Sequence, residues 1–270
     1  MAYIEPNEFV TKMVDSGEQK VFMSTKDTFI RAFMAGAILG LAALFAITVA
    51  VTTGNFLVGA LLFPVGFIML YLMKFDLLTG VFTLVPLALI DKRPGVTFNG
   101  LMRNWGLVFV GNFAGALTTA FFASFILTYG YSVDGGALAE KVSSIGESRT
   151  LGYQEHGVAG WFTIFIRGML CNWMVSMGVV GAMISTSAGS KMAAMWMPVM
   201  LFFFMGFEHS IVNMFLFPFS MIMGGEFTVS DYLIWNELPT ALGNLAGGFL
   251  LVGLPLYLTH VRTSPERRIA

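Results

Sequence analysis

Charged residues are scarce in this chain, and cysteine and histidine are scarcer still. Only 11% of the 270 residues are charged, against roughly 25% in soluble globular proteins. The net charge of −1 gives no sign of a nucleic-acid partner. The single Cys171 excludes a disulfide within the chain. Three scattered histidines and one cysteine do not supply the clustered groups of a membrane enzyme. We therefore expect no enzyme, no metal site and no cofactor.

What the sequence has in abundance is apolar length, with 56% hydrophobic residues. A membrane-crossing helix needs about 20 predominantly apolar residues, so the runs predict an all-α membrane protein. The six predicted spans are 28–52, 57–91, 99–129, 158–186, 190–222 and 238–261. Between them lie TTGNF, the DKRPG turn, a polar segment at 130–157, the SAGSK turn and GGEFTVSDY.

The first residues differ in character from the rest. Segment 1–24 carries acids and lacks the apolar core of a cleaved signal peptide. Phe9, Val10, Met13 and Val14 have the spacing of a short amphipathic helix near the membrane surface. A frayed polar tail with one helical turn fits the same residues, and both readings stay open.

Lysine and arginine are distributed unevenly between the two sides that six spans define. One side has Lys12, Lys20, Lys26, Arg31, Lys92, Arg93, Arg103, Lys191, Arg262, Arg267 and Arg268. The other has Lys141 and Arg149. Because cytoplasmic connections carry the basic excess, both termini, including the tail 263–270, are predicted in the cytoplasm and 130–157 outside. The chain is then a multi-pass protein of the cytoplasmic (inner) membrane, in contact with lipid.

Two of the spans are too long for one straight crossing. Residues 57–91 would form a helix of about 50 Å, whereas the hydrocarbon core is about 30 Å thick. This span is disturbed at 74–80, and the span 190–222 is disturbed at 206–210. Non-helical backbone at this depth is tolerated only where it faces protein or a watery cavity. Both breaks are therefore candidate binding sites.

The two halves of the chain resemble each other. Phe29-Ile30-Arg31 recurs as Phe165-Ile166-Arg167, 136 residues later. Thereafter the offset is 132, pairing Phe75-Asp76 with Phe207-Glu208, Pro86 with Pro218, and Gly111-Asn112 plus Gly115 with Gly243-Asn244 plus Gly247. Three spans per half is an odd number, so the second repeat (158–262) is inverted relative to the first (25–129). Paired broken helices in such repeats aim positive half-helix N-termini at a midplane site, which favours anions.

Four motifs carry a family resemblance. They are Asp76-Leu77-Leu78-Thr79-Gly80, Gly111-Asn112, Gly168-Met169-Leu170-Cys171-Asn172-Trp173 and Gly206-Phe207-Glu208-His209-Ser210-Ile211-Val212-Asn213-Met214-Phe215. In order and spacing over about residues 20–262, the chain resembles the formate/nitrite transporter family. The resemblance implies a homopentamer of aquaporin-like protomers. It also implies that each protomer has its own pore for small monovalent anions such as formate, nitrite or hydrosulfide.

The resemblance also implies roles for individual residues. Thr79 and His209 would form the central pair, with Asn172 as a neighbour holding the imidazole. The apolar constrictions would be Phe67, Leu77 and Phe202, with Phe63 and Leu78 nearby. Phe67 replaces the aliphatic residue usual in relatives, which we expect to narrow one gate.

The chain departs from the family's pattern at two charged positions. Where many relatives carry an outer-vestibule lysine, this chain has His156 preceded by Glu155, so the fixed outer positive charge is expected to be missing. Lys74, by contrast, lies inside the first break, where relatives mostly have a small residue. We hypothesise that Lys74 supplies part of the electrostatic attraction that the outer vestibule lacks.

Each site residue also has a structural interpretation. A lone core histidine is commonly structural, but the place of His209 in one of two matched breaks favours function. Its neutral ring can donate a hydrogen bond to an anion, and its charged form can hand over a proton. A threonine at a helix start is often only an N-cap, although we favour pore lining for Thr79. Asp76 and Glu208 are expected to cap the half-helices that follow rather than carry protons.

Other functions fit the sequence less well. A water or glycerol channel would share the architecture, but the chain has no Asn-Pro-Ala motif. A purely structural or receptor subunit would not need two interrupted helices. The resemblance favours formate as the substrate, with proton sharing at His209. Nitrite and hydrosulfide, and channel versus proton-coupled carrier, stay open.

Overall fold

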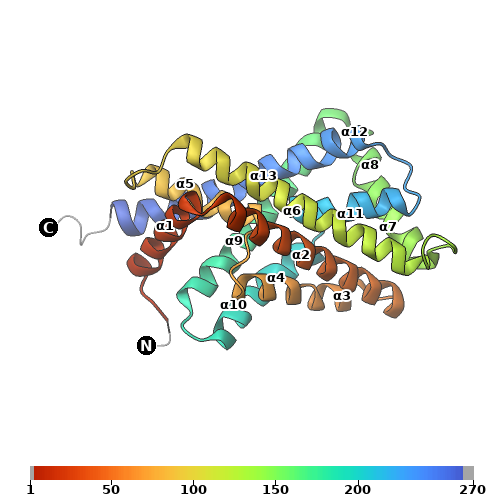
Figure 1. The fold of residues 1–270 in the computed structure, drawn as a ribbon, viewed down its shortest axis with the longest axis horizontal. Coiled ribbons are helices and arrows are strands. Elements are labelled where there is room, and N and C mark those ends of the chain that lie inside the picture. Colours follow the sequence, from red (N-terminus) through yellow and green to blue (C-terminus); the bar gives the residue numbers. More distant parts are fainter. Residues whose placement is uncertain (1–2, 264–270) are drawn as a thin grey trace.

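The computed structural model describes residues 3–263, and nearly all of them are helical (Figure 1). The first half contains α1 (Pro6–Phe22), α2 (Thr25–Thr53), α3 (Phe56–Leu62), α4 (Pro64–Leu72), α5 (Leu78–Ile90) and α6 (Phe98–Leu127). The connection contains α7 (Gly136–Ser148) and α8 (Leu151–Gln154). The second half contains α9 (Gly157–Ile184), α10 (Ala188–Phe204), α11 (Ser210–Ile222) and a last long helix. That helix consists of α12 (Val229–Tyr232), η1 (Leu233–Glu237), α13 (Leu238–Gly248), η2 (Phe249–Gly253), α14 (Leu254–Tyr257) and η3 (Leu258–Arg262).

The six predicted spans are present, and two of them are interrupted as expected. Four helices are long and apolar enough to cross a membrane unaided: Thr25–Thr53, Phe98–Leu127, Gly157–Ile184 and Val229–Arg262. The other two spans are α3–α4 followed by α5, and α10 followed by α11. In Figure 1, α5 and α11 extend from the middle of the molecule toward opposite ends, as an inverted repeat requires.

Both breaks use the same backbone turn. In the first, the amides of Lys74 and Phe75 donate to Tyr71 and Leu70 carbonyls, and in the second Gly206 and Phe207 do the same to Phe203 and Phe202. The turn requires a left-handed residue, with φ 58° at Lys74 and 64° at Gly206. Glycine adopts this conformation freely, whereas a lysine is strained there.

Glycines bring the outer helices of each half into backbone contact. A Cβ on Gly115 of α6 would lie 1.9 Å from the Phe33 carbonyl oxygen of α2, and one on Gly247 of α13 would lie 2.0 Å from that of Met169 on α9. Small residues at helix interfaces are how membrane helices pack closely. The matched glycines explain why this part of the repeat is visible in the sequence.

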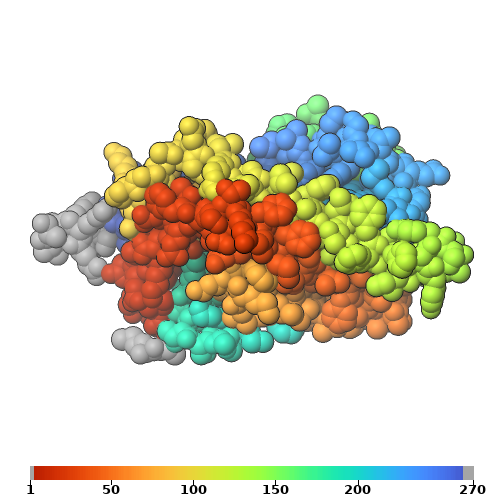
Figure 2. All heavy atoms as spheres, in the orientation of Figure 1, coloured from red at the N-terminus to blue at the C-terminus, as the bar shows by residue number. Residues whose placement is uncertain are grey.

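The N-terminal segment forms a full helix, α1, whose apolar face is covered by protein. Phe9, Val10, Met13 and Val14 are buried, and α1 packs on α5, α6 and α9. Figure 2 shows α1 seated against the bundle at one end. The amphipathic helix, and not the frayed tail, is therefore the reading that the structure supports, and its apolar stripe packs on other helices of the protein. The C-terminal part of the last helix, which ends at Arg262, lies at the same end (Figure 1).

Two segments predicted as connections are helical. The polar segment 130–157 folds into α7 and α8, and α7 packs on α11. The last helix begins at Val229, inside the predicted separator, because Thr228 and Asp231 form a reciprocal capping box there. The tail residues 264–270, including Arg267 and Arg268, lie outside the described part of the chain, as do residues 1 and 2.

Candidate functional site

The start of the first half-helix, α5, is held by a buried asparagine from α6. Asn112 Oδ1 accepts the Leu78 amide at 2.9 Å. Its Nδ2 donates to the carbonyls of Ala32 at 2.8 Å and Asp76 at 2.9 Å. One side chain thus satisfies the helix start and two carbonyl groups beside it, which lipid could not do.

The second half-helix, α11, is held in the same way. Asn244 Oδ1 accepts the Ser210 amide at 2.9 Å, and Nδ2 donates to the carbonyls of Gly168 at 2.8 Å and Glu208 at 2.9 Å. Each partner corresponds through the repeat to a partner of Asn112. The two asparagines that correspond in the sequence repeat therefore hold the starts of the two half-helices in the same way.

The two half-helices meet at His209 and Thr79. His209 is the N-cap of α11, and its Nδ1 accepts the amides of Ile211 at 3.2 Å and Val212 at 3.4 Å. With Nδ1 accepting, the proton of the neutral ring is on Nε2. Nε2 lies 3.4 Å from the Thr79 hydroxyl, so the imidazole presents an N–H where two positive helix ends converge.

Thr79 is not a helix N-cap, which was the less favoured interpretation, and Asn172 does not have the role that the resemblance implied. Leu77, not Thr79, is the N-cap of α5, and Thr79 lies within its first turn. The hydroxyl of Thr79 is therefore free to face His209. Asn172 does not hold the imidazole: its Nδ2 donates to the carbonyls of Thr79 at 3.1 Å and Asn244 at 2.6 Å. This correction makes Asn172 a bridge between the two halves.

Aromatic and aliphatic side chains surround this polar pair. All five residues predicted to form constrictions are buried: Phe63, Phe67, Leu77, Leu78 and Phe202. The ring of Phe202 lies over His209, with centroids 5.4 Å apart and planes at 26°. Phe63 packs edge-on against Phe202 at 5.7 Å. Phe67 and Leu77 lie on the other approach and line a cavity that leads to Thr79.

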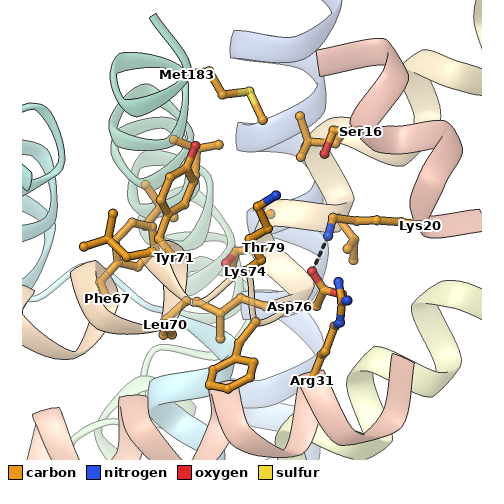
Figure 3. A pocket seen from close by; sticks show the side chains of 18 of the residues that line it. Ser16, Lys20, Arg31, Phe67, Leu70, Tyr71, Lys74, Asp76, Thr79 and Met183 are labelled. Atoms are coloured by element: carbon orange, nitrogen blue, oxygen red, sulfur yellow. Dashed lines mark hydrogen bonds and ion pairs between the residues drawn. The ribbon is translucent and has the colours of Figure 1, made fainter. Parts of the chain in front are cut away.

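This cavity has a volume of about 460 Å³ and lies at the end of the molecule that holds α1. Its charged lining residues are Lys20, Arg31, Lys74, Asp76 and Lys191. Lys20 forms an ion pair with Asp76. Figure 3 shows Lys20, Asp76 and Arg31 on one side, Phe67 and Tyr71 on the other, and Lys74 between them. The cavity is therefore positively charged on balance, and its lining includes Thr79, the neighbour of His209.

A sequence profile of the formate/nitrite transporter family, described as "Formate/nitrite transporter", matches residues 7–258. The chain belongs to the formate/nitrite transporter family. It is 32% identical to the "Probable formate transporter" of Methanothermobacter thermautotrophicus, over 86% of this chain and 88% of that one. This is a family of membrane channels and transporters, not of enzymes.

Solved structures of the formate/nitrite transporter family share the fold. An "FNT family ion channel" superposes with a TM-score of 0.81 at 22% identity, covering 93% of this chain and 98% of the other. A "Pentameric formate channel with formate bound" gives a TM-score of 0.69 at 24% identity, covering 87% and 96%. The aquaporin-like protomer expected from the sequence is thereby confirmed.

The two carboxylates at the breaks do not cap the half-helices as predicted. The asparagines and His209 take the helix amides, and the carboxylates bind cations instead. Asp76 pairs with Lys20 and leaves Oδ2 without a hydrogen bond among the described residues. Glu208 lies 3.6 Å from Arg149 Nη1 and also accepts from neighbouring side chains. Those donors are Tyr153, Asn213 and Asn236, at 3.0 to 3.3 Å.

At the second break, a basic residue from the connection between the halves lies beside the buried carboxylate. That the outer vestibule lacks a fixed cation stays a prediction. Glu155 and His156 are exposed and line no part of the cavity. Arg149, at the end of α7, supplies the positive charge at Glu208, because α7 folds back over α11. Burial, and after it the charge of Glu208, raise the pKa of Tyr153 to about 12, so this hydroxyl stays protonated and donates to Glu208.

Sequence reasoning missed the partners of the break carboxylates, namely Lys20, Arg149 and Tyr153, and the cavity cations Arg31 and Lys191. A carboxylate at membrane depth needs a cation or a hydrogen-bond donor as its partner. The sequence therefore indicated that such partners exist. Which residue meets that need depends on how α1 and α7 pack, and no spacing in the sequence gives that.

Proposed function

We propose that this chain forms a pore for small monovalent anions, with formate as its main substrate and Thr79 and His209 as the central site. The observation that carries the proposal is the His209 Nε2–H beside the hydroxyl of Thr79, a residue that lines a cavity rich in basic residues. Two half-helix N-termini also converge there, and such ends favour anions. Relatives and a similar structure described as formate transporters or channels support formate in particular.

The proposed passage begins with attraction to the cavity, in which Lys74 takes part. The anion then loses water between Phe67 and Leu77, where a bare charge is costly. Hydrogen bonds from the Thr79 hydroxyl and His209 Nε2–H replace that water. Phe202 and Phe63, with Leu78, form the apolar barrier beyond, which a neutral acid crosses more easily than its anion.

Proton sharing at His209 has a defined cost in this geometry. A neutral imidazole donates a hydrogen bond through Nε2. If it gave that proton fully to formate, the ring would become an anion unless Nδ1 gained a proton. That proton would displace the amides of Ile211 and Val212 from Nδ1. We therefore propose a shared Nε2–H···anion bond, with full transfer only when a proton from water reaches the ring.

The proposal extends to assembly and placement in the cell. We infer a homopentamer in the cytoplasmic membrane, supported by the pentameric structure that the chain resembles. The basic residues concentrated at the cavity end favour a cytoplasmic location for that end and both termini. Segments 1–24 and 263–270 would then be cytoplasmic, 130–157 would be outside, and 25–129 and 158–262 would be the two repeats.

Flux in proteoliposomes tests the proposal. Formate, nitrite and hydrosulfide uptake is measured in one preparation across about pH 4–8, a range that spans histidine titration. We expect formate to pass fastest. Faster nitrite or hydrosulfide flux would reassign the substrate within the family, and absence of all three fluxes from folded protein would contradict the pore.

Lys74 is tested in the same preparation. Lys74→Met removes the charge and keeps a long side chain at the strained position, so we expect slower formate uptake at low ionic strength, where electrostatic attraction is least screened. Unchanged uptake with an unchanged pH profile would show that Lys74 takes no part in attraction.

A further inference from the structure

The cavity holds more positive charge than a single monovalent anion can use. Asp76 is the one acidic residue among its described lining residues, and it is already paired with Lys20. Arg31, Lys74 and Lys191 make no ion pair or side-chain hydrogen bond within residues 3–263. These three cations, from α2, the first break and α10, converge on one space.

The cavity is also much larger than formate. About 460 Å³ falls within the range of roughly 300–1,000 Å³ typical of sites for organic ligands. Phe67 and Tyr71 lie on the side opposite Lys20 and Arg31 (Figure 3), and Val179 and Met183 add apolar surface to the lining. Charge on one side and apolar surface on the other are the features that hold an organic anion.

Lys74 adds an independent observation. It occupies the left-handed position where the second half has Gly206, and a non-glycine residue is strained there. Strain of this kind persists where the side chain is needed. In Figure 3 the Lys74 ammonium group lies between the basic and the apolar side of the cavity.

We propose that the cavity is a binding site for an organic anion with two or more carboxylate or phosphate groups, which blocks the pore from this end. The charged groups bind Arg31, Lys74 and Lys191, and the carbon skeleton lies against Tyr71 and Phe67. Such a ligand stops above Thr79, because desolvating several charges between Phe67 and Leu77 costs far more than desolvating one. The blocking effect rests on the proposed pore, whereas the binding does not.

Citrate serves as the probe. Calorimetry on the purified full-length protein is expected to show citrate binding that weakens as salt is added. An uncharged ester of citrate is expected not to bind. Lys191→Met and Lys74→Met should each weaken citrate binding about three- to tenfold, the range expected for one half-exposed ion pair. Lys141→Met, which changes an exposed lysine of α7 that does not line the cavity, should leave citrate binding unchanged.

Flux from each side completes the test. In membrane vesicles of known orientation, citrate is expected to slow formate flux only when it is present on the cavity side, with each variant's citrate-free flux as its reference. Citrate binding that neither lysine affects, or equal block from both sides, would overturn the inference. If the protein bound citrate in a lysine-dependent way but carried no formate flux, the proposed pore would be refuted and the citrate site would stand.

Discussion

The two helix breaks share a backbone design and differ in their charges. Asn112 and Asn244 make the same three hydrogen bonds, and both turns have a left-handed residue. Around the first break, the carboxylate of Asp76 has one partner, Lys20, and faces a cavity. Around the second, the carboxylate of Glu208 is fully buried in a network of a cation, a tyrosine and two amides.

This difference separates what the fold requires from what the proposed pathway adds. An inverted repeat places equivalent backbone at both breaks, so the asparagines are needed twice. The symmetry does not fix the charges, because α1 supplies the cation at Asp76 of the first break, whereas α7 and α8 supply the cation and the tyrosine at Glu208 of the second. The first break is left open and cationic, and the second is closed by polar side chains.

The largest expected effect is on the shared backbone design. Asn112→Ala and Asn244→Ala should each destabilise the protein by about 4 kcal/mol, because each leaves the first amide of a half-helix and the carbonyl of Asp76 or Glu208 buried without a partner. Thermal unfolding in detergent measures the loss. Asn55→Ala, which removes only the exposed cap of α3, should cost about 1 kcal/mol. If one of the two buried asparagines proved dispensable, the equivalence of the breaks would be wrong.

The next effect separates the two carboxylates. Lys20→Met should destabilise by about 3 kcal/mol, since it leaves Asp76 buried without a cation. Arg149→Met should cost about 1 kcal/mol, because Glu208 keeps three other donors. The double variant Lys20→Met/Asp76→Asn should regain most of the loss. Equal losses in the two single variants would remove the contrast between the breaks.

A smaller effect, on flux alone, is expected at the meeting point of the halves. Thr79→Val removes the hydroxyl beside His209 Nε2 and should slow formate flux about tenfold, the equivalent of one hydrogen bond to the passing anion. Thr79→Ser should retain the flux. Thr119→Val, which removes a buried hydroxyl on α6, is the matched control and should not alter it. Equal flux in Thr79→Val and in the control would exclude Thr79 from the pathway.

The smallest effect concerns the strained residue. Lys74→Gly should stabilise the protein by about 1 kcal/mol, because glycine adopts the left-handed turn freely. The same change should lower formate uptake at low salt. Denaturation and uptake are compared on one preparation. A loss of stability in Lys74→Gly would mean that Lys74 is held for packing and not for its charge.

The sequence predicted the fold well because its signals are local or repeated. The lengths of the apolar runs predicted the membrane spans, and the matching pairs Gly111-Asn112 and Gly243-Asn244 indicated the internal repeat. The breaks followed from spans longer than the membrane core. Helix α7 and the start at Val229 were missed because their residues are polar, and polarity was taken to mark connections.

The central pair of the candidate site was predicted, whereas the residues that surround the pair were not. Thr79 and His209 lie together as the family resemblance implied, whereas Asn172 binds the backbone of the two halves instead of the imidazole. The partners of Asp76 and Glu208 come from α1 and from the α7–α8 segment, far away in the chain. Only the packed structure shows which cations reach them.

The most direct measurement is formate flux against pH in proteoliposomes of the wild type and His209→Asn. Asparagine also caps helices, so α11 should still start normally while the Nε2–H is lost. We predict that His209→Asn abolishes the flux or removes its wild-type dependence on pH. A His209→Asn protein with wild-type flux and an unchanged pH profile would contradict the claim that formate passes this imidazole.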